Sequence, residues 1–301
     1  MFRTRSSARR YGFALAPLSA AALWGGMYVV SKWTFAAIPP VTLGFLRVAL
    51  GALVLFAVAK SRGVRVERED YGRFIVLGGW VALTIATQFV GTELTNASQG
   101  SLLTVLTPVF TVALGVSVLD ERLTAKKSLG MALAVVGTLF VVAGQYRLSD
   151  LAAGNLAGLA ALVAASVAWA GYTVWGVPVV RRYSALTAAT YATVAATPML
   201  ALLSAAELVA GGVPADAFAP SLPTLGAVVY LGVAATAAAW YLWYKGLEYV
   251  GAGTVAVFFF AQPVVGAALG AVLLGERVGP AFLVGGLVMA VGVTVVSTAR
   301  A

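Results

Sequence analysis

Apolar residues fill ten stretches of the 301-residue chain, and each stretch is about as long as a membrane span. A bilayer core of about 30 Å is crossed by roughly 20 residues of helix. Short polar or charged segments separate the stretches, and the shortest separation lies around residues 245–250. The pattern predicts an all-α integral membrane protein with ten transmembrane helices. The predicted helices cover about residues 14–36, 41–60, 73–93, 99–119, 126–144, 153–177, 185–207, 222–245, 250–274 and 279–298.

The first apolar stretch follows a basic segment, residues 1–13, and so resembles a secretory signal peptide. However, its apolar run continues past Trp33, whereas the apolar region of a signal peptide has about 7–15 residues. We therefore predict that the segment is retained as the first transmembrane helix.

Lysine and arginine are distributed unevenly across the predicted membrane. If successive helices alternate in direction, sixteen of the twenty basic residues fall on one side, and only Arg147 and Arg277 fall on the other. Lys32 and Arg47 lie within spans. Because cytoplasmic loops carry the excess of basic residues, we expect residues 1–13 and 299–301 to be cytoplasmic. The Ala- and Gly-rich composition and the lack of an organelle signal favour the plasma (inner) membrane of a prokaryote.

Composition agrees with a lipid environment and removes several kinds of chemistry. The chain is 61% hydrophobic and 10% charged, whereas soluble domains carry roughly 25% charged residues. Histidine and cysteine are absent, which excludes disulfides, imidazole bases, thiolate nucleophiles and Cys/His metal sites. We therefore expect neither a cofactor nor a metal. The net charge is +9, but the basic residues lie between the apolar runs. We therefore expect the lipid bilayer, and not nucleic acid, as the partner of these basic residues.

The chain contains an internal repeat. "TPVFTVALGVSVLDERL" at residues 107–123 matches "QPVVGAALGAVLLGERV" at residues 262–278, with an offset of 155. Upstream the offset is 145, where Trp24 matches Trp169 and Gly26 matches Gly171. The repeat predicts two five-helix units, residues 14–144 and 153–298, joined by an outer linker at residues 145–152.

Five helices per unit is an odd number, so the second unit must start from the opposite side of the membrane. Inverted repeats of this kind enclose a binding site near the membrane midplane, and exchanging their conformations alternates access to it. We therefore expect a central cavity between the units. A duplicated channel would show the same pattern.

The sequence resembles the drug/metabolite transporter superfamily, in its EamA-type branch, over nearly its whole length. The resemblance rests on residues 23–55, on residues 96–142 and on the second copy at residues 251–296. It implies a ten-helix carrier in which the fifth and tenth spans are peripheral, and whose relatives move amino acids, sugars, nucleotide sugars and other metabolites. Asp120 departs from the family, which often has Gly there, and the sixth span has no basic residue to match Lys32.

Lys32 and Arg47 are the strongest candidates for substrate binding, because cations inside a span mark functional sites by default. Across the short "IPP" turn they are predicted at similar depths, where two cations suit a carboxylate or a phosphate. Alternatively, these long side chains could reach the headgroups, which the depth of Arg47 makes harder, and Arg47 could also pair with helix-end carbonyls.

Aromatic and polar residues within the spans complete the predicted substrate site. Aromatic residues in these positions either line a cavity or pack between helices, and polar ones must find hydrogen bonds away from lipid. These candidates are Trp24, Tyr28, Gln88, Thr92, Gln99, Trp169, Tyr172, Trp240, Tyr244 and Gln262.

Two further pairs repeat between the units. Pro108 and Pro263 each remove a backbone donor and are predicted as hinges or as packing kinks. Glu121 and Glu276 are predicted at the start of the following helix, where a carboxylate favours the helix dipole, or at a gate.

No Asp or Glu falls in the middle of any predicted span. Proton and sodium coupling commonly use such carboxylates, so their absence weakens the case for ion-coupled transport and argues against an intramembrane enzyme. We therefore predict a secondary transporter that exports a small polar or amphipathic metabolite, such as an amino acid, by alternating access. The alternatives are a passive channel, a structural membrane subunit and, last, an intramembrane enzyme. The sequence leaves the oligomeric state open.

Overall fold

Helices make up all the regular secondary structure in the part of the chain that the computed structural model describes. That part comprises residues 5–95, 100, 103, 106–145, 156–211, 221–262, 265 and 279–298. The all-α prediction is confirmed over these ranges. The predicted site residues Gln99, Pro263 and Glu276 lie outside them.

The described α-helices overlap the predicted spans, and several of them extend beyond the predicted ends. In the first unit they are α1 (Arg5–Trp24), α2 (Met27–Thr34), α3 (Pro40–Ser61), the short η1 (Arg68–Asp70), α4 (Tyr71–Leu94), α6 (Leu106–Leu119) and α7 (Ala125–Gln145). In the second they are α9 (Leu156–Arg182), α10 (Ala185–Ala210), α11 (Leu222–Val229), η3 (Tyr230–Ala238), α12 (Ala239–Leu247), α13 (Ala252–Ala256), η4 (Val257–Phe260) and α15 (Pro280–Ser297).

Six described helical segments are long and apolar enough to cross a membrane, and two shorter apolar helices accompany them. The six are Ala14–Thr34, Pro40–Ser61, Arg68–Leu94, Leu156–Arg182, Ala185–Ala210 and Leu222–Leu247, and the shorter ones are Leu106–Leu119 and Leu283–Val296. The chain is therefore a multi-pass membrane protein.

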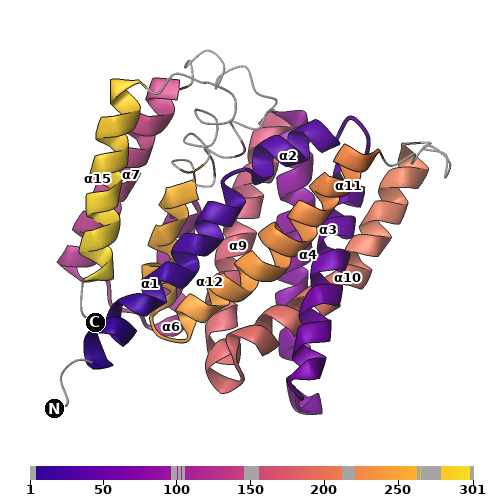
Figure 1. The fold of residues 1–301 in the computed structure, drawn as a ribbon, viewed down its shortest axis with the longest axis horizontal. Coiled ribbons are helices and arrows are strands. Elements are labelled where there is room, and N and C mark those ends of the chain that lie inside the picture. Colours follow the sequence, from indigo (N-terminus) through magenta and orange to yellow (C-terminus); the bar gives the residue numbers. More distant parts are fainter. Residues whose placement is uncertain are drawn as a thin grey trace.

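The two units run in opposite directions. We call the face where α1 begins the N-terminal face, and the start of α1 and the end of α15 both lie on it (Figure 1). α3 runs back toward this face, and its end is followed by Glu67, which contacts Arg182 at the end of α9. α9 therefore points opposite to α1, its counterpart in the repeat, as the inverted arrangement requires.

Helices α7 and α15, the fifth and tenth spans, pack against each other at one edge of the molecule (Figure 1). Their backbones touch through glycines: a Cβ on Gly137 would lie 2.6 Å from the Gly285 oxygen, and one on Gly130 would lie 2.8 Å from the Gly292 oxygen. Small residues permit such close helix contacts in membranes. The pair is peripheral, as the resemblance implied.

The first span is not the single helix that the sequence predicted. Its helix begins earlier, at Arg5, and breaks at the pair Gly25–Gly26 before α2 starts at Met27. The break frees backbone carbonyls: Tyr230 Oη donates to the Leu23 oxygen at 2.6 Å, and Gln262 Nε2 donates to the Trp24 oxygen at 3.2 Å. Partners from the second unit therefore stabilise the break.

The eighth span is also irregular, because η3 is a π-helix of nine residues between α11 and α12. π-Helical segments are rare and often mark functional sites. Within it Thr236 Oγ1 donates to the Leu231 oxygen, five residues back, at 2.8 Å. The Ala235 carbonyl accepts hydrogen bonds from two residues of the first unit, which belong to the site described below.

Acidic residues at the helix edges cap helices to which they do not belong. Glu207 accepts hydrogen bonds from the backbone N–H groups of Val41 and Thr42, at 2.9 and 2.7 Å, at the start of α3. Glu248 accepts one from the N–H of Ala185, at 2.8 Å, at the start of α10. The free N–H groups of a first helical turn favour a carboxylate. These acids therefore join neighbouring spans.

Glu121 does not cap the following helix, so that part of its predicted role is wrong. Thr124 Oγ1 instead accepts a hydrogen bond from Lys127 N at the start of α7, at 3.3 Å. Glu121 accepts bonds from Ala252 N at 2.7 Å and from Gly253 N at 3.2 Å, at the start of α13 in the second unit. The turn before it uses Asp120 at φ 53°, the left-handed region, which explains why glycine suits that position.

Candidate substrate-binding site

A cavity of about 30 Å³ lies between the two units, and we call it the chamber. Its walls come from α1, α2, α3, α4 and α6 of the first unit and from α9, α12 and η4 of the second. The structure brings seven of the predicted binding residues together here. They are Trp24, Tyr28, Arg47, Gln88, Trp169, Trp240 and Gln262.

Arg47 is the charged residue of the chamber wall, and its exposed fraction is 1%. It lies seven residues into α3, or about 10 Å below the start of the helix. Its guanidinium does not extend toward the lipid headgroups, which was the alternative left open by the sequence. Nε donates to Thr236 Oγ1 at 2.9 Å and Nη2 donates to the Ala235 oxygen at 3.0 Å, both in η3.

The surroundings of Arg47 contain rings and a sulfur atom but no carboxylate. Nη1 lies 2.9 Å from Met27 Sδ, and the guanidinium carbon lies 5.5 Å and 6.0 Å from the ring centres of Phe89 and Trp240. Among the described residues, no Asp or Glu lines the chamber and none pairs with Arg47. A buried cation without a counter-ion is costly, so its position favours a bound anion.

The structure does not bring Lys32 to the chamber. Its Nζ lies 2.9 Å from Glu93 Oε2 and donates to the Glu93 backbone oxygen at 2.8 Å, and its side chain is 34% exposed. Lys32 therefore joins the end of α2 to the end of α4. The predicted pair of cations is divided between an exposed ion pair and the chamber.

Aromatic rings close the chamber toward the N-terminal face. Trp24 contacts Trp169 edge-on with ring centres 5.2 Å apart, and Phe259 lies 5.3 Å from Trp24. α9 and α12 both run toward the N-terminal face, so Tyr172 and Tyr244 lie beyond these rings and stack with centres 4.6 Å apart. Tyr172 and Tyr244, both predicted as binding residues, are buried below the chamber wall.

The remaining polar candidates differ in their roles. Gln88 lines the chamber and donates from Nε2 to Tyr28 Oη at 2.8 Å. Thr92 is buried outside the described chamber lining, and its hydroxyl donates to the Gln88 oxygen of its own helix at 2.7 Å. Pro108 is buried in α6, and its role as a hinge stays a prediction.

The residues of the site that were not predicted from the sequence include Met27, Thr236 and Phe259. Thr236 carried a usable signal, because it is the single hydroxyl in an Ala-rich part of a span. Met27 and Phe259 could not be distinguished in the sequence, because most side chains in a membrane span are apolar. The backbone acceptor at Ala235 depends on the π-helix and has no sequence signature.

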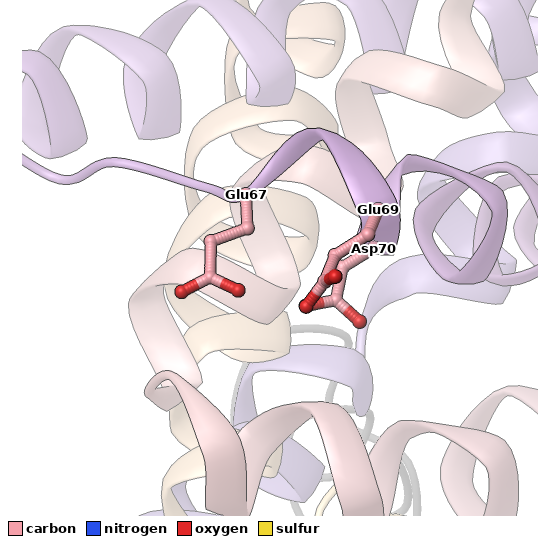
Figure 2. Close-up of side chains that lie close together, drawn as sticks. All are labelled: Glu67, Glu69 and Asp70. Carbon is pink, nitrogen blue, oxygen red and sulfur yellow. The ribbon is translucent and has the colours of Figure 1, made fainter.

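A second cluster of charged residues lies on the N-terminal face, outside the chamber (Figure 2). Glu67, Glu69 and Asp70 are near enough to one another to suggest a metal site. Arg182 instead bonds all three, with nitrogen–oxygen distances of 2.6, 2.8 and 3.1 Å. The hydroxyl of Tyr183 donates to Asp70 Oδ2, which raises the pKa of Tyr183. This cluster joins the end of α9 to the first unit.

The sequence pattern of the EamA-like transporter family matches residues 11–143 and again residues 156–298. The chain belongs to this family. Each unit of the repeat therefore matches the family pattern, and the resemblance noted from the sequence is confirmed. Family membership indicates transport as the activity.

Individual relatives narrow the comparison. The chain is 29% identical over 279 residues to a protein of Salmonella typhimurium named "Probable amino-acid metabolite efflux pump", covering 90% of this chain and 89% of that one. It is 27% identical over 262 residues to an uncharacterized transporter of Archaeoglobus fulgidus, covering 84% and 87%. A crystal structure with 22% identity superimposes with a TM-score of 0.74 over 95% of this chain and 97% of that one, which shows a shared fold.

Proposed function

We propose that this EamA-family protein is a secondary carrier that exports a small metabolite, of the amino-acid type, by alternating access. The observation that carries the proposal is Arg47, a buried cation without a described counter-ion in a chamber between two inverted units. A guanidinium binds carboxylates with paired N–H donors, and amino acids and their derivatives carry a carboxylate. The name of the Salmonella relative supports the same class of solute and the outward direction.

The proposed carrier cycle uses the inverted arrangement. The two units, residues 14–144 and 153–298, would exchange conformations, with Pro108 and Pro263 as hinges and with Glu121 and Glu276 at opposite faces. In the structure, the aromatic rings close the chamber toward the N-terminal face, and Glu121 holds the start of α13 on that same side. Breaking the bond between Glu121 and α13 is then part of opening the N-terminal face, which we assign to the cytoplasm of a prokaryotic cell.

Counterflow in proteoliposomes tests this proposal. Vesicles loaded with an unlabelled amino acid are diluted into a trace of the same labelled compound, and a panel of amino acids is screened in this way. A carrier accumulates label transiently, because inward and outward movements share one site. A channel or a structural subunit would show label that only equilibrates, and this result for every solute of the panel would refute the carrier proposal.

A further inference from the structure

Two buried polar atoms at the chamber wall have no hydrogen-bond partner among the described residues. They are Oε1 of Gln262 and Nε1 of Trp169. The exposed fractions of these residues are 2% and 6%. Burying a polar group without a partner destabilises a protein, so such atoms at a cavity wall indicate the groups of a ligand.

The orientation of the Gln262 amide follows from its other contact. Its Nε2 lies 3.2 Å from the Trp24 backbone oxygen, which is freed by the break in the first span. A carbonyl oxygen only accepts hydrogen bonds, so the NH₂ group must face it. The remaining atom, Oε1, is therefore an acceptor, and its ligand must carry a donor.

Arg47 and Trp169 carry hydrogen-bond donors, so their ligand must carry an acceptor. Arg47 has five N–H donors, and its described bonds to Thr236, Ala235 and Met27 use three of them. The Trp169 indole adds one more donor without a described partner. A ligand that satisfies the chamber therefore carries an anionic acceptor as well as an N–H donor.

We propose that the chamber recognises both ends of a zwitterionic amino acid, with Arg47 binding the carboxylate and Gln262 Oε1 accepting a hydrogen bond from the ammonium group. This inference rests on the proposed function and specifies its substrate. It requires the chamber, whose volume in this structure is about 30 Å³, to widen when an amino acid binds. The Trp169 indole N–H is a second donor to the carboxylate. The faces of the chamber tryptophans stabilise the ammonium, since aromatic rings attract cations.

The same contacts exclude two other classes of solute. An amine without a carboxylate would meet Arg47 in a chamber whose described lining contains no Asp or Glu. A solute with two negative charges would need a second cation, but Lys32 is paired with Glu93 outside the chamber. A carboxylic acid without an amine would satisfy Arg47 and leave Gln262 Oε1 unpaired, so it should bind more weakly than the amino acid.

Matched sets of compounds test the proposal on the wild-type carrier. Each set has an amino acid, its deaminated acid and its decarboxylated amine, such as L-leucine, 4-methylpentanoate and 3-methylbutylamine, with a second set built on L-phenylalanine. The readout is the concentration that halves exchange of the labelled amino acid in proteoliposomes. The zwitterion should compete at least about tenfold better than the acid, and the amine should compete least.

Gln262→Leu tests the residue itself. It removes the acceptor at similar volume, so the preference for the amino acid over its deaminated acid should fall about tenfold, while the acid competes as before. Thr84→Val is the matched control, because Thr84 lines the same chamber but its hydroxyl already donates to the Trp80 oxygen of its own helix. A Gln262→Leu carrier that keeps the full preference would overturn the role of Gln262.

The outcomes separate this inference from the carrier proposal. If the wild-type protein exchanges solutes but prefers acids, amines or uncharged compounds, the zwitterion site is wrong and the carrier stands. If no solute shows counterflow, the carrier proposal itself fails. Should Gln262→Leu not fold, the ranking of the three compounds on the wild-type protein still decides the substrate class.

Discussion

The two units hold each other at two very different places. At the chamber, Arg47 and Trp24 of the first unit both donate to the Ala235 oxygen of η3, and Tyr230 of η3 donates back to the first unit at Leu23. On the N-terminal face, Arg182 of the second unit meets three carboxylates of the first. Figure 2 shows these three carboxylates. The first contact is buried and has one charge, whereas the second is exposed, apart from the buried Asp70, and has charges of both signs.

This difference indicates that the buried contact serves substrate binding, whereas the contact on the N-terminal face serves the assembly of the two units. In the cluster on the N-terminal face each of the three acids is paired with Arg182, and water and salt weaken such ion pairs. The buried contact uses irregular backbone, a break in the first span and a π-helix in the eighth, to place carbonyl acceptors around a cation that keeps spare donors. Irregular backbone inside a membrane is tolerated where it lines a cavity.

The repeat does not duplicate this arrangement. At the offset of 145, the counterpart of Arg47 is Ala192, which is fully buried. The counterpart of the broken first span is α9, a continuous helix of 27 residues. The two units therefore share a fold but contribute differently to the site. The first unit supplies the cation, and the second unit supplies the oxygen acceptors that hold it.

Arg47→Met should have the largest effect. The change keeps an unbranched apolar stem and removes the charged guanidinium, so we expect exchange of amino acids to fall about a hundredfold, as for the loss of two hydrogen bonds to a charged group. Thermal unfolding of the purified protein should change little, because a buried cation without a counter-ion contributes little net stability.

Arg47→Lys serves as the control for this experiment, since it keeps the charge and should retain part of the exchange. If Arg47→Met exchanges normally, then the cation is structural. If Arg47→Met is strongly destabilised, then the bonds to η3 exceed the cost of burying the charge, and the buried contact serves assembly as much as function.

Tyr230→Phe should have an intermediate effect, on stability. It leaves the Leu23 oxygen without its 2.6 Å hydrogen bond at the break of the first span, and such a loss costs roughly 1–3 kcal/mol. Denaturant unfolding in detergent measures this cost. Tyr241→Phe is the matched control, because the Tyr241 hydroxyl lies in the same span and has no described hydrogen bond. Equal stability of the two variants would show that the break does not depend on Tyr230.

Much of the fold could be predicted from the sequence, because span length and the repeat are periodic signals. The number of spans and the inversion follow from the apolar runs and the repeat, whereas the peripheral position of the fifth and tenth spans was implied by the family resemblance. The break at Gly25–Gly26 and the π-helix could not be predicted. Each depends on a partner from the other unit, and a hydropathy pattern contains no information about such partners.

The site was predictable where a residue is costly in a membrane. Arg47 and Gln262 stood out because their polar groups need partners there, and both line the chamber. Lys32 was indistinguishable from Arg47 by the same criterion. Lys32 pairs with Glu93 because the ends of α2 and α4 lie close together in the fold. The sequence alone does not show that these two helix ends are neighbours.

Arg182→Gln should have a small effect on stability, and that effect should vanish at about 1 M salt, where screening reaches about 3 Å. Exposed ion pairs contribute little even when several share one arginine. Arg181→Gln is the control, since Arg181 is exposed and has no described ion pair. A large loss that salt does not reduce would mean that the exposed cluster, and not the buried contact, holds the units together.

Tyr183→Phe should have the smallest effect and a distinctive pH dependence. The hydrogen bond to Asp70 raises the pKa of Tyr183 in the folded protein above the value of about 10 expected after unfolding. A raised pKa stabilises the fold below the unfolded pKa, and this contribution is lost as the pH rises through the folded value. The wild-type protein should therefore be slightly more stable than Tyr183→Phe from about pH 7 to 9, and the difference should close above about pH 10. Tyr71→Phe, whose exposed hydroxyl has no described hydrogen bond, should show no such convergence. If the difference between wild type and Tyr183→Phe stays constant up to alkaline pH, the bond to Asp70 does not form in solution, and the exposed cluster depends on Arg182 alone.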